Sequence, residues 1–507
     1  MKVKSVCIVG GGSSGWMMAR ALTANLEGVQ VTLVSSTKIG TIGVGESTIP
    51  SIVGFISNTL KFEETFWMRR CSATYKSSIR FNNFTSNTEP SFHPFFGASY
   101  ANGYNWIVHN ALSAEKLPLK DYNDMHLETK MSKCNKFTKE SSDGTPTGYA
   151  YHLDAGKFGE LCRTESQGVN HVIGTVKTVK VSDTEGVEYL ETEEGDILKA
   201  DLYIDCSGFS SLLLGGALKE PFHSFDKYLI NNKAMAARIP YSSKEEELQP
   251  FTDCTALSNG WAWNTPLWDR VGTGYVYSDK FCSSERAEQE FKKYLSHRFG
   301  TARAEEADIH HIGMRTGYYK RPWVKNCVSL TLTAGFIEPL ESTGLAITAD
   351  QIQDLLSVLK TGGFSSLDRS RYNHSSNKYF EDIKDFIVSH YINTDREDSK
   401  YWEYLSSEVL PPPKLLETLS SLGKGERPDH YFNAKSWEHI LVGFNITMLD
   451  RYLRYDGDSI CALSEEDSRA VIAETEKYII DLKKHTNDEV SSMPSHYTYL
   501  KDNIYYD

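Results

Sequence analysis

The sequence has 507 residues, of which 40% are hydrophobic and 24% charged, a composition typical of a folded protein with more than one structural region. The formal net charge of −13 and the lack of a basic run argue against a nucleic acid partner, because such a surface repels phosphate backbones. Aromatic residues make up 12% of the chain, which suits an aromatic-lined cavity as well as ordinary core packing.

The first 34 residues predict a βαβ unit, with a strand over 3–9, a helix over 16–26 and a strand over 29–34. Residues 81–144 are rich in Asn, Ser, Tyr and Phe, and they predict a loop-rich insertion. The remaining predicted elements are a helix within 153–171, a strand over 172–181, a strand over 201–205, antiparallel strands over 229–239 and 270–278, a strand over 327–333, a helix over 345–359 and a mostly helical C-terminal region.

The nine cysteines are dispersed without any CxxC pair, which indicates reduced thiols and neither a disulfide framework nor a zinc site. The chain opens directly into a strand-like segment, which leaves no room for a signal peptide, and no apolar run is long enough to cross a bilayer. We therefore expect a cytoplasmic protein with no bound metal and no membrane partner. The sequence leaves open whether the chain forms a homo-oligomer.

Three glycines, Gly10, Gly12 and Gly15, form a G-x-G-x-x-G pattern between the first strand and the first helix. The first glycine permits a tight turn, the second lets a pyrophosphate approach the backbone, and the third lets the helix pack closely on the strand. The helix start at Ser13 and Ser14 offers N–H groups to phosphate. This pattern predicts dinucleotide binding.

The second strand ends at Ser35 and Ser36, where dinucleotide-binding folds usually carry an acid that contacts the ribose. A hydroxyl group can still bind a ribose, but its hydrogen bond is weaker than that of a carboxylate. The sequence therefore predicts the contacts of the cofactor's adenosine end less clearly than those of its pyrophosphate.

Three later motifs each have a plain structural reading as well as a functional one. Residues 41–50 (TIGVGESTIP) hold two glycines that would let a planar ring approach the backbone, or they form a simple turn. Residues 260–266 (GWAWNTP) place Trp261 and Trp263 on one side of an extended segment, which also describes an aromatic anchor. Residues 335–344 (GFIEPLESTG) lead into a helix whose free N–H groups offer an anion site, although Glu341 beside it is also typical of simple capping.

Together these four motifs resemble those of the flavin-dependent halogenases, above all the tryptophan-halogenase type. The resemblance runs from residue 3 to beyond residue 440 and is most specific over 260–277 and 326–344. It implies an α/β fold of the Rossmann-like, FAD-binding flavin monooxygenase/halogenase kind with a mainly helical substrate lobe. The implied FAD-binding module is discontinuous (1–80, 150–215 and 320–350), and residues 81–149, 216–319 and 351–507 form the implied substrate-binding lobe with its helical C-terminal region.

The resemblance also assigns residues to roles. Lys76 matches the family's essential lysine and Glu341 its essential glutamate, while the N–H groups of Thr343 and Gly344 match the halide site. The implied FAD contacts are Gly10, Gly12, Ser13, Ser14, Gly15, Ser35, Gly43, Val44, Gly45, Glu46, Val176, Gly335 and Ser342.

The implied reaction uses reduced FAD, delivered by a separate flavin reductase, to turn oxygen and halide (chloride, bromide or iodide) into hypohalous acid. The acid passes through the protein to Lys76, which hydrogen-bonds it or forms a haloamine and aims the halogen at an aromatic ring. Glu341 polarises the electrophile or removes the ring proton. The chain shows no obvious second dinucleotide fingerprint, which is consistent with an external reductase.

For the substrate, an indole, a phenol or tryptophan, the matching residues are His93, Phe95, Tyr391, Glu397, Tyr401 and Trp402. The family pattern is not complete, because His390 replaces a tyrosine and Ser406 replaces an asparagine that helps to hold the amino acid. Thr265 likewise stands where the family usually has isoleucine. We therefore expect a weakened clamp for free tryptophan.

Two other functions share parts of this pattern. A single-component flavoprotein aromatic hydroxylase would use the glycine motif and flavin contacts near Asp205 and Gly335, but it has no need of Lys76 or a halide site. A flavin-binding protein without catalytic activity would have no physical need of Lys76, Glu341 and the 342–344 segment together.

Overall fold

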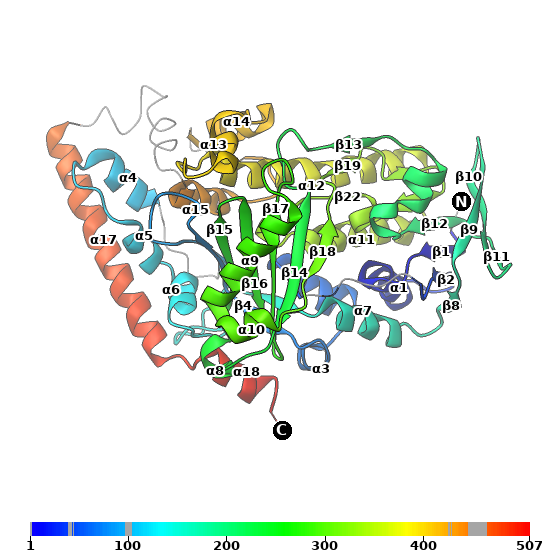
Figure 1. Cartoon of the computed structure of the whole chain (residues 1–507), viewed down its shortest axis with the longest axis horizontal. Coiled ribbons are helices and arrows are strands. Elements are labelled where there is room, and N and C mark those ends of the chain that lie inside the picture. Colours follow the sequence, from blue (N-terminus) through cyan, green and yellow to red (C-terminus); the bar gives the residue numbers. More distant parts are fainter. Residues whose placement is uncertain are drawn as a thin grey trace. The chain divides into compact units, whose positions relative to one another are not determined.

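The computed structural model describes residues 3–38, 43, 45–96, 104–423, 426, 428–444 and 464–506, and Figure 1 shows its helices and strands. The chain divides into two compact units, each made of three segments. Unit 1 comprises Met1–Ala73, Leu153–Asp226 and Met314–Glu381, and unit 2 comprises Thr74–His152, Lys227–Gly313 and Asp382–Asp507. Unit 1 contains most of the segments predicted for FAD binding, and unit 2 most of the predicted substrate lobe; both roles stay predictions.

Unit 1 is built on a six-stranded sheet in the order β20-β21-β12-β1-β2-β8. Every neighbouring pair is parallel except β20 and β21. The side chains of β12 are all buried and those of β1 nearly so, as expected for parallel strands that are covered on both faces. The strands are β1 (Ser5–Val9), β2 (Gln30–Ser35), β8 (Asn170–Ile173), β12 (Leu202–Asp205), β20 (Trp323–Val324) and β21 (Cys327–Ser329).

Helix α1 (Ser13–Asn25) connects β1 to β2 and packs against α7 (Ala155–Thr164). This arrangement confirms the predicted N-terminal βαβ unit. The other elements of unit 1 are β3 (Glu46–Ser47), α2 (Ser51–Gly54), η1 (Phe55–Thr59), α3 (Glu64–Arg70), β9 (Val176–Ser182), β10 (Gly186–Thr192), β11 (Ile197–Leu198), η2 (Gly208–Ser210), η3 (Leu212–Ala217), β13 (Phe222–Ser224), β19 (Gly317–Tyr319), η4 (Thr331–Thr333), β22 (Gly335–Phe336), η5 (Pro339–Glu341) and α11 (Gly344–Lys360); α12 (Ser366–Ile392) continues into unit 2.

Unit 2 holds a seven-stranded sheet in the order β18-β14-β17-β16-β15-β5-β6. Its neighbours are antiparallel except β15 and β5, which run parallel. Beside it, β4 (Thr74–Lys76) pairs antiparallel with β7 (Ala150–Leu153). The strands of the large sheet are β5 (Ser78–Asn82), β6 (Ser91–Pro94), β14 (Lys233–Ile239), β15 (Phe251–Leu257), β16 (Gly260–Pro266), β17 (Val271–Tyr277) and β18 (His310–Gly313).

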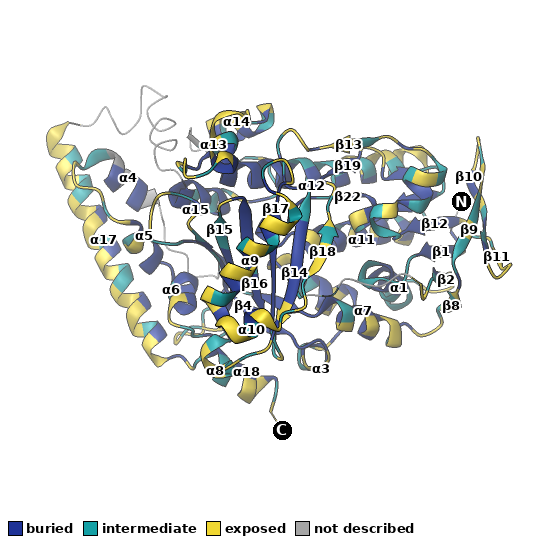
Figure 2. Cartoon of the chain, viewed as in Figure 1, coloured by how far each residue is buried: buried dark blue, intermediate teal, exposed yellow. Residues whose placement is uncertain are grey.

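Figure 2 shows that the strands from β14 to β17 are mostly buried, whereas α17 exposes much of its length. Helix α17 packs against α4, α5 and α6, and its Ile479 joins a core with Trp106 and Tyr122. The helices of unit 2 are α4 (Tyr104–Leu112), α5 (Leu119–Asp124), α6 (Leu127–Lys133), α8 (Lys244–Glu247), α9 (Ser284–Phe299), α10 (Thr301–Glu305), α13 (Lys400–Ser407), α14 (Pro413–Gly423), α15 (Ala434–Phe444), α17 (Glu465–Ser492) and α18 (His496–Asn503).

Three predicted segments differ from the structure. The predicted insertion 81–144 holds the three helices α4, α5 and α6 as well as β6, because short helices gain their stability from tertiary packing that local composition does not reveal. The single strand predicted over 172–181 is two strands, β8 and β9, which belong to different sheets. The strand predicted over 327–333 ends at Ser329 and continues as the 3-10 helix η4.

The eight cysteines that the structure describes are free thiols, and seven of them are buried. Among the described helices, none is both long enough and apolar enough to cross a membrane.

Candidate active site

The glycine motif of unit 1 forms a tight turn that leaves space for a ligand at its second glycine. Gly10 has φ +118°, and a Cβ atom on it would lie 2.3 Å from the carbonyl oxygen of Cys206. A Cβ atom on Gly15 would lie 2.0 Å from the Gly10 carbonyl oxygen. By contrast, a Cβ atom on Gly12 would meet no atom of the described chain within 4 Å. The first and third glycines are therefore fixed by the protein's own backbone, whereas the second faces open space.

Helix α1 starts directly after this open position. Its N-cap is Gly12, which has no side chain to cap the helix, so the first N–H groups are offered to a ligand. Ser13 does not compete for that role, because its hydroxyl donates to the carbonyl of Ala155 at 2.7 Å. An open cradle in front of a helix N-terminus fits the pyrophosphate of FAD.

At the end of β2, the side chain of Ser35 is paired with a residue that the sequence did not point to. Ser35 Oγ lies 2.8 Å from Nε2 of His171 on β8, and the His171 ring packs edge-on against Trp16 at a centroid distance of 4.9 Å. These three residues gather at the position where the ribose-binding acid is usually found. His171 is 136 positions away from Ser35 in the chain, so no local pattern could have revealed the pair.

The other predicted FAD contacts lie at several places in the chain. Gly43 and Gly45 precede β3, whose first residue, Glu46, is exposed, and Val44 lies outside the described residues. Val176 is the first residue of β9, and Gly335 lies in β22. Their contacts with FAD stay predictions.

Glu341 is the last residue of the 3-10 helix η5, and Ser342 and Thr343 join this helix to α11. Glu341 is fully buried, and Ser342 follows it in the left-handed region with φ +60°. Thr343 is the N-cap of α11 but, within the described structure, its side chain makes no capping hydrogen bond. Gly344 is exposed and Thr343 is buried, so this helix start can be reached from solvent on one side. The geometry suits a small anion.

In unit 2, Lys76 lies at the end of β4 with no exposed surface. Its Nζ atom is 4.9 Å from the centroid of the Phe95 ring. The backbone fixes this contact, because the N–H of Phe95 donates to the carbonyl of the neighbouring Ser77 at 2.8 Å. Burial lowers the pKa of His152 well below its usual value, and the nearby charge of Lys76 lowers it further. His152 is therefore neutral beside the lysine.

The strand of Lys76 is tied to the segment that carries the two tryptophans. Thr74 donates from its hydroxyl to the carbonyl of Pro266 at 2.6 Å. Pro266 ends β16, in which Trp261 is fully buried and Trp263 half-buried, and their ring centroids lie 6.1 Å apart. The tryptophan pair and the lysine thus belong to one connected part of unit 2.

The residues predicted to contact substrate form two groups. Phe95 stands next to Lys76, and the His93 ring lies with its centroid 6.4 Å from that of Phe95 and 5.8 Å from that of Phe386. The second group is Tyr391, Tyr401 and Trp402, all buried.

Internal hydrogen bonds engage this second group. Asn231 donates to the Tyr391 hydroxyl at 3.3 Å and accepts from the Tyr401 hydroxyl at 3.1 Å. The indole N–H of Trp402 donates to the carbonyl of Leu257 at 2.7 Å. Glu397 is exposed. The polar groups of the two tyrosines and of Trp402 are thus engaged within the protein, and their contact with a substrate stays a prediction.

Comparison with known proteins identifies the family to which the chain belongs. The family model described as tryptophan halogenase matches residues 5–453. The tryptophan 6-halogenase of Streptomyces toxytricini is 33% identical over 432 residues, which cover 80% of this chain and 81% of that protein. The 7-chloro-L-tryptophan 6-halogenase of Kutzneria sp. (strain 744) is 30% identical over 526 residues, covering 97% of this chain and 98% of the relative.

Among solved structures, a flavin-dependent halogenase from Xanthomonas campestris superposes with a TM-score of 0.85 at 28% identity, covering 99% of this chain and 98% of the other. This similarity confirms the predicted α/β, FAD-binding fold class, and the relatives do not favour the hydroxylase alternative. The predicted membership is also confirmed: the chain belongs to the tryptophan halogenase family and is a flavin-dependent halogenase.

Proposed function

We propose that this enzyme attaches a halogen to an electron-rich aromatic ring, an indole or a phenol, and that Lys76 presents the oxidised halogen to that ring. The observation that carries the proposal is the complete burial of Lys76 beside Phe95, whose ring centroid lies 6.4 Å from that of His93. A buried amine beside an aromatic ring is costly to maintain and is well placed to meet an aromatic substrate.

When bound and reduced, FAD supplies the two electrons with which oxygen oxidises a halide ion to hypohalous acid, with water as the other product. The residues that would hold FAD are the open cradle at Gly12 and the N–H groups at the start of α1. The N–H groups of Thr343 and Gly344 would hold the halide ion before it is oxidised. We further propose that a separate flavin reductase delivers the reduced FAD.

Lys76 acts on the oxygen of hypohalous acid through a hydrogen bond from its ammonium group, or binds the halogen as a haloamine. Either form makes the halogen the electrophile while oxygen departs in water, and either form fixes the direction of attack. The ring carbon that gains the halogen must then lose a proton. Glu341, a buried carboxylate, is our candidate to take that proton or to polarise the electrophile.

The relatives named above act on tryptophan or chlorotryptophan. Three features support a substrate without a free amino-acid group for this chain. His390 and Ser406 replace the tyrosine and asparagine of the tryptophan-binding pattern, Glu397 is exposed, and the hydroxyls of Tyr391 and Tyr401 are bonded to Asn231.

The test supplies reduced FAD from an added reductase, oxygen, and either chloride, bromide or iodide to a panel containing indole, phenols and tryptophan. We expect one halogenated regioisomer by mass spectrometry, with indoles or phenols turned over faster than tryptophan. A hydroxylated product formed with direct NADPH consumption would support the hydroxylase instead. Faster turnover of tryptophan than of every other compound would overturn the substrate proposal and leave the halogenase assignment intact.

A further inference from the structure

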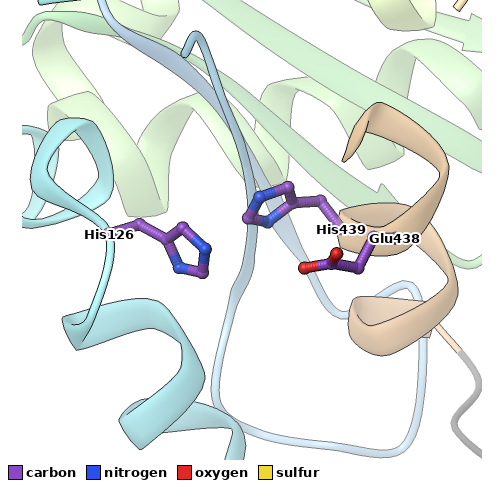
Figure 3. A group of neighbouring side chains, drawn as sticks. All are labelled: His126, Glu438 and His439. Atoms are coloured by element: carbon purple, nitrogen blue, oxygen red, sulfur yellow. The ribbon is translucent and has the colours of Figure 1, made fainter. Parts of the chain in front are cut away.

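Unit 2 contains a cluster of three side chains that have no role in the reaction proposed above. His126 lies between α5 and α6, and Glu438 and His439 are neighbours on α15 (Figure 3). One nitrogen or oxygen atom from each residue lies within 4.8 Å of the other two. We propose that His126, Glu438 and His439 form a binding site for a divalent cation of the zinc class. Two imidazoles and one carboxylate are a donor set that Zn²⁺ favours.

The two histidines are arranged as metal-ligating histidines usually are. His126 Nδ1 is 2.8 Å from the carbonyl oxygen of Tyr122, which fixes the tautomer with the proton on Nδ1 and makes Nε2 the nitrogen with which this ring would ligate an ion. His439 is 2% exposed, and its Nε2 atom is buried with no hydrogen-bond partner among the described residues. A buried nitrogen of this kind requires an explanation, because desolvating a polar atom without a partner costs free energy.

One residue, Tyr122, supports all three side chains. Its carbonyl orients His126, and its hydroxyl donates to Oε1 of Glu438 at 2.8 Å. The Tyr122 ring packs against His126 and His439 at centroid distances of 4.8 and 5.1 Å. Hydrogen bonds to a carboxylate and a histidine from outside the donor set are the usual means by which proteins orient metal ligands.

Charges around the cluster are compatible with a cation. Burial lowers the pKa of both His126 and His439, which opposes a positive charge on either ring itself. Lys435 is close enough to lower both values further and therefore opposes a cation. Glu438 and Glu128 both act on Lys435 with the opposite sign, which offsets its charge.

The separation of the donors must contract when an ion binds. Ligand atoms around a tetrahedral Zn²⁺ lie about 3.4 Å apart, so a movement of roughly an ångström is needed. Glu438 is only half-buried and can supply this movement, whereas the two histidine rings already meet edge-on with their centroids 4.5 Å apart. The bound ion would join the α5–α6 junction to α15, two segments more than 300 residues apart in the chain.

The test uses the whole chain, stripped of metal with a chelator and then titrated with Co²⁺ and Zn²⁺. We expect one Co²⁺ per chain with the visible absorption of a four-coordinate ion, displaced by Zn²⁺, and a rise in melting temperature with Zn²⁺. His439→Ala should weaken Zn²⁺ binding at least about 10-fold, and Tyr122→Phe should weaken it by a smaller factor. Glu438→Gln preserves size and packing, and it provides the same test if His439→Ala folds poorly.

The control is the double variant His310→Ala with His311→Ala, because these exposed histidines lie beside Asp308 and Glu288 and could bind ions adventitiously. It should retain the Co²⁺ spectrum. The proposal is overturned if the wild type takes up no Co²⁺, if the surface double variant loses it, or if both His439→Ala and Glu438→Gln bind as tightly as the wild type. None of these readouts depends on halogenase activity.

Discussion

Lys76 and Phe95 form a buried pair in which the lysine Nζ lies 4.9 Å from the centroid of the aromatic ring. The lysine has no exposed surface, and Phe95 is 3% exposed. The negative face of an aromatic ring partly compensates an ammonium group for the water it has lost. The ring therefore helps to keep a charged amine at a position from which solvent is excluded.

Replacing this lysine should remove halogenation and leave the flavin chemistry in place. Lys76→Met keeps the length of the side chain and removes its hydrogen bonds, so we expect product formation to fall at least about 100-fold. Oxidation of reduced FAD by oxygen, followed by absorbance, should continue at the wild-type rate.

The matched control is Lys139→Met, since the Lys139 Nζ lies 5.2 Å from the rings of both Tyr75 and Tyr149. If both variants lost halogenation equally, the loss would reflect the removal of a stabilising contact between an ammonium group and an aromatic ring, and Lys76 would have no special role in the reaction. Undiminished product from Lys76→Met would remove Lys76 from the reaction.

Glu341 can be tested against a carboxylate with the same burial. Glu338 is the N-cap of the short η5 helix and Glu341 its last residue, and neither has exposed surface. Glu341→Gln should lower kcat by a factor of about 100 to 10,000 if its carboxylate moves a proton or polarises the electrophile. Glu338→Gln should change kcat much less, whereas both variants should change the melting temperature to a similar degree. Equal losses of kcat would assign Glu341 a purely structural role.

Local sequence patterns predicted the elements whose contacts join residues that are close together in the chain. The β1–α1–β2 unit follows from apolar periodicity and three glycines, and the helix predicted at 345–359 is α11 with one more residue at each end. The strand pairings of unit 2 could not be predicted in this way. Arg80 on β5 lies opposite Asp253 on β15 and forms an ion pair with it at 2.8 Å across 173 positions, and nothing local in either strand encodes that register.

In the candidate site, too, local motifs predicted some residues, whereas others are brought together only by the tertiary fold. Lys76 was found by its resemblance to a motif, but its burial depends on Phe95 and on strands brought together by the tertiary fold. His171 and the His126–His439 pair carry no spacing signal, because each pair of partners meets only in the folded chain.

The glycine motif yields a prediction that separates folding from cofactor binding. Gly12→Ala places a methyl group in open space, so the free protein should keep its melting temperature. The affinity for FAD should fall at least about 10-fold, because that methyl group stands where the pyrophosphate approaches.

Gly10→Ala is the matched change, and it should destabilise the protein even without FAD. Its new Cβ atom would lie 2.3 Å from the Cys206 carbonyl oxygen, and φ +118° is strained for alanine. Calorimetry of the free protein and a fluorescence titration with FAD measure the two effects. Equal FAD affinity for Gly12→Ala and the wild type would place the pyrophosphate elsewhere.

The pair of Ser35 and His171 should contribute to FAD affinity in place of the missing acid. Ser35→Ala removes the neutral hydrogen bond that its hydroxyl would make to the ribose, which is worth about 1 kcal/mol, so the Kd for FAD should rise about fivefold. His171→Leu removes the partner that holds this hydroxyl in place and should act in the same direction. Ser36→Ala is the control, because Ser36 makes a similar bond to Thr175 at 2.7 Å one position further along. If only Ser36→Ala weakened binding, the adenosine end would lie beside Ser36 instead.

Buried neutral histidines in unit 2 should make the fold sensitive to mild acid. Burial lowers the pKa of His126 to about 4 and that of His496 to about 3, whereas both return to about 6.5 in the unfolded chain. The unfolded state therefore binds protons first, and the stabilisation present above pH 6.5 is lost as the pH falls toward 4. At pH 5 the loss is roughly 2 kcal/mol for each histidine.

His496→Gln should flatten this dependence, because glutamine does not titrate and can keep a hydrogen bond to the Leu248 carbonyl, which His496 Nδ1 meets at 3.3 Å. Urea unfolding midpoints measured at pH 7, 6 and 5 should converge for this variant and the wild type as the pH falls. His310→Gln changes an exposed histidine and should reproduce the wild-type curve at every pH. Below pH 6.5 the unfolded chain protonates this histidine and the folded chain does not, so the free energy of unfolding must fall if His496 stays neutral in the fold. Parallel curves for His496→Gln and the wild type would therefore mean that another group sets the acid sensitivity.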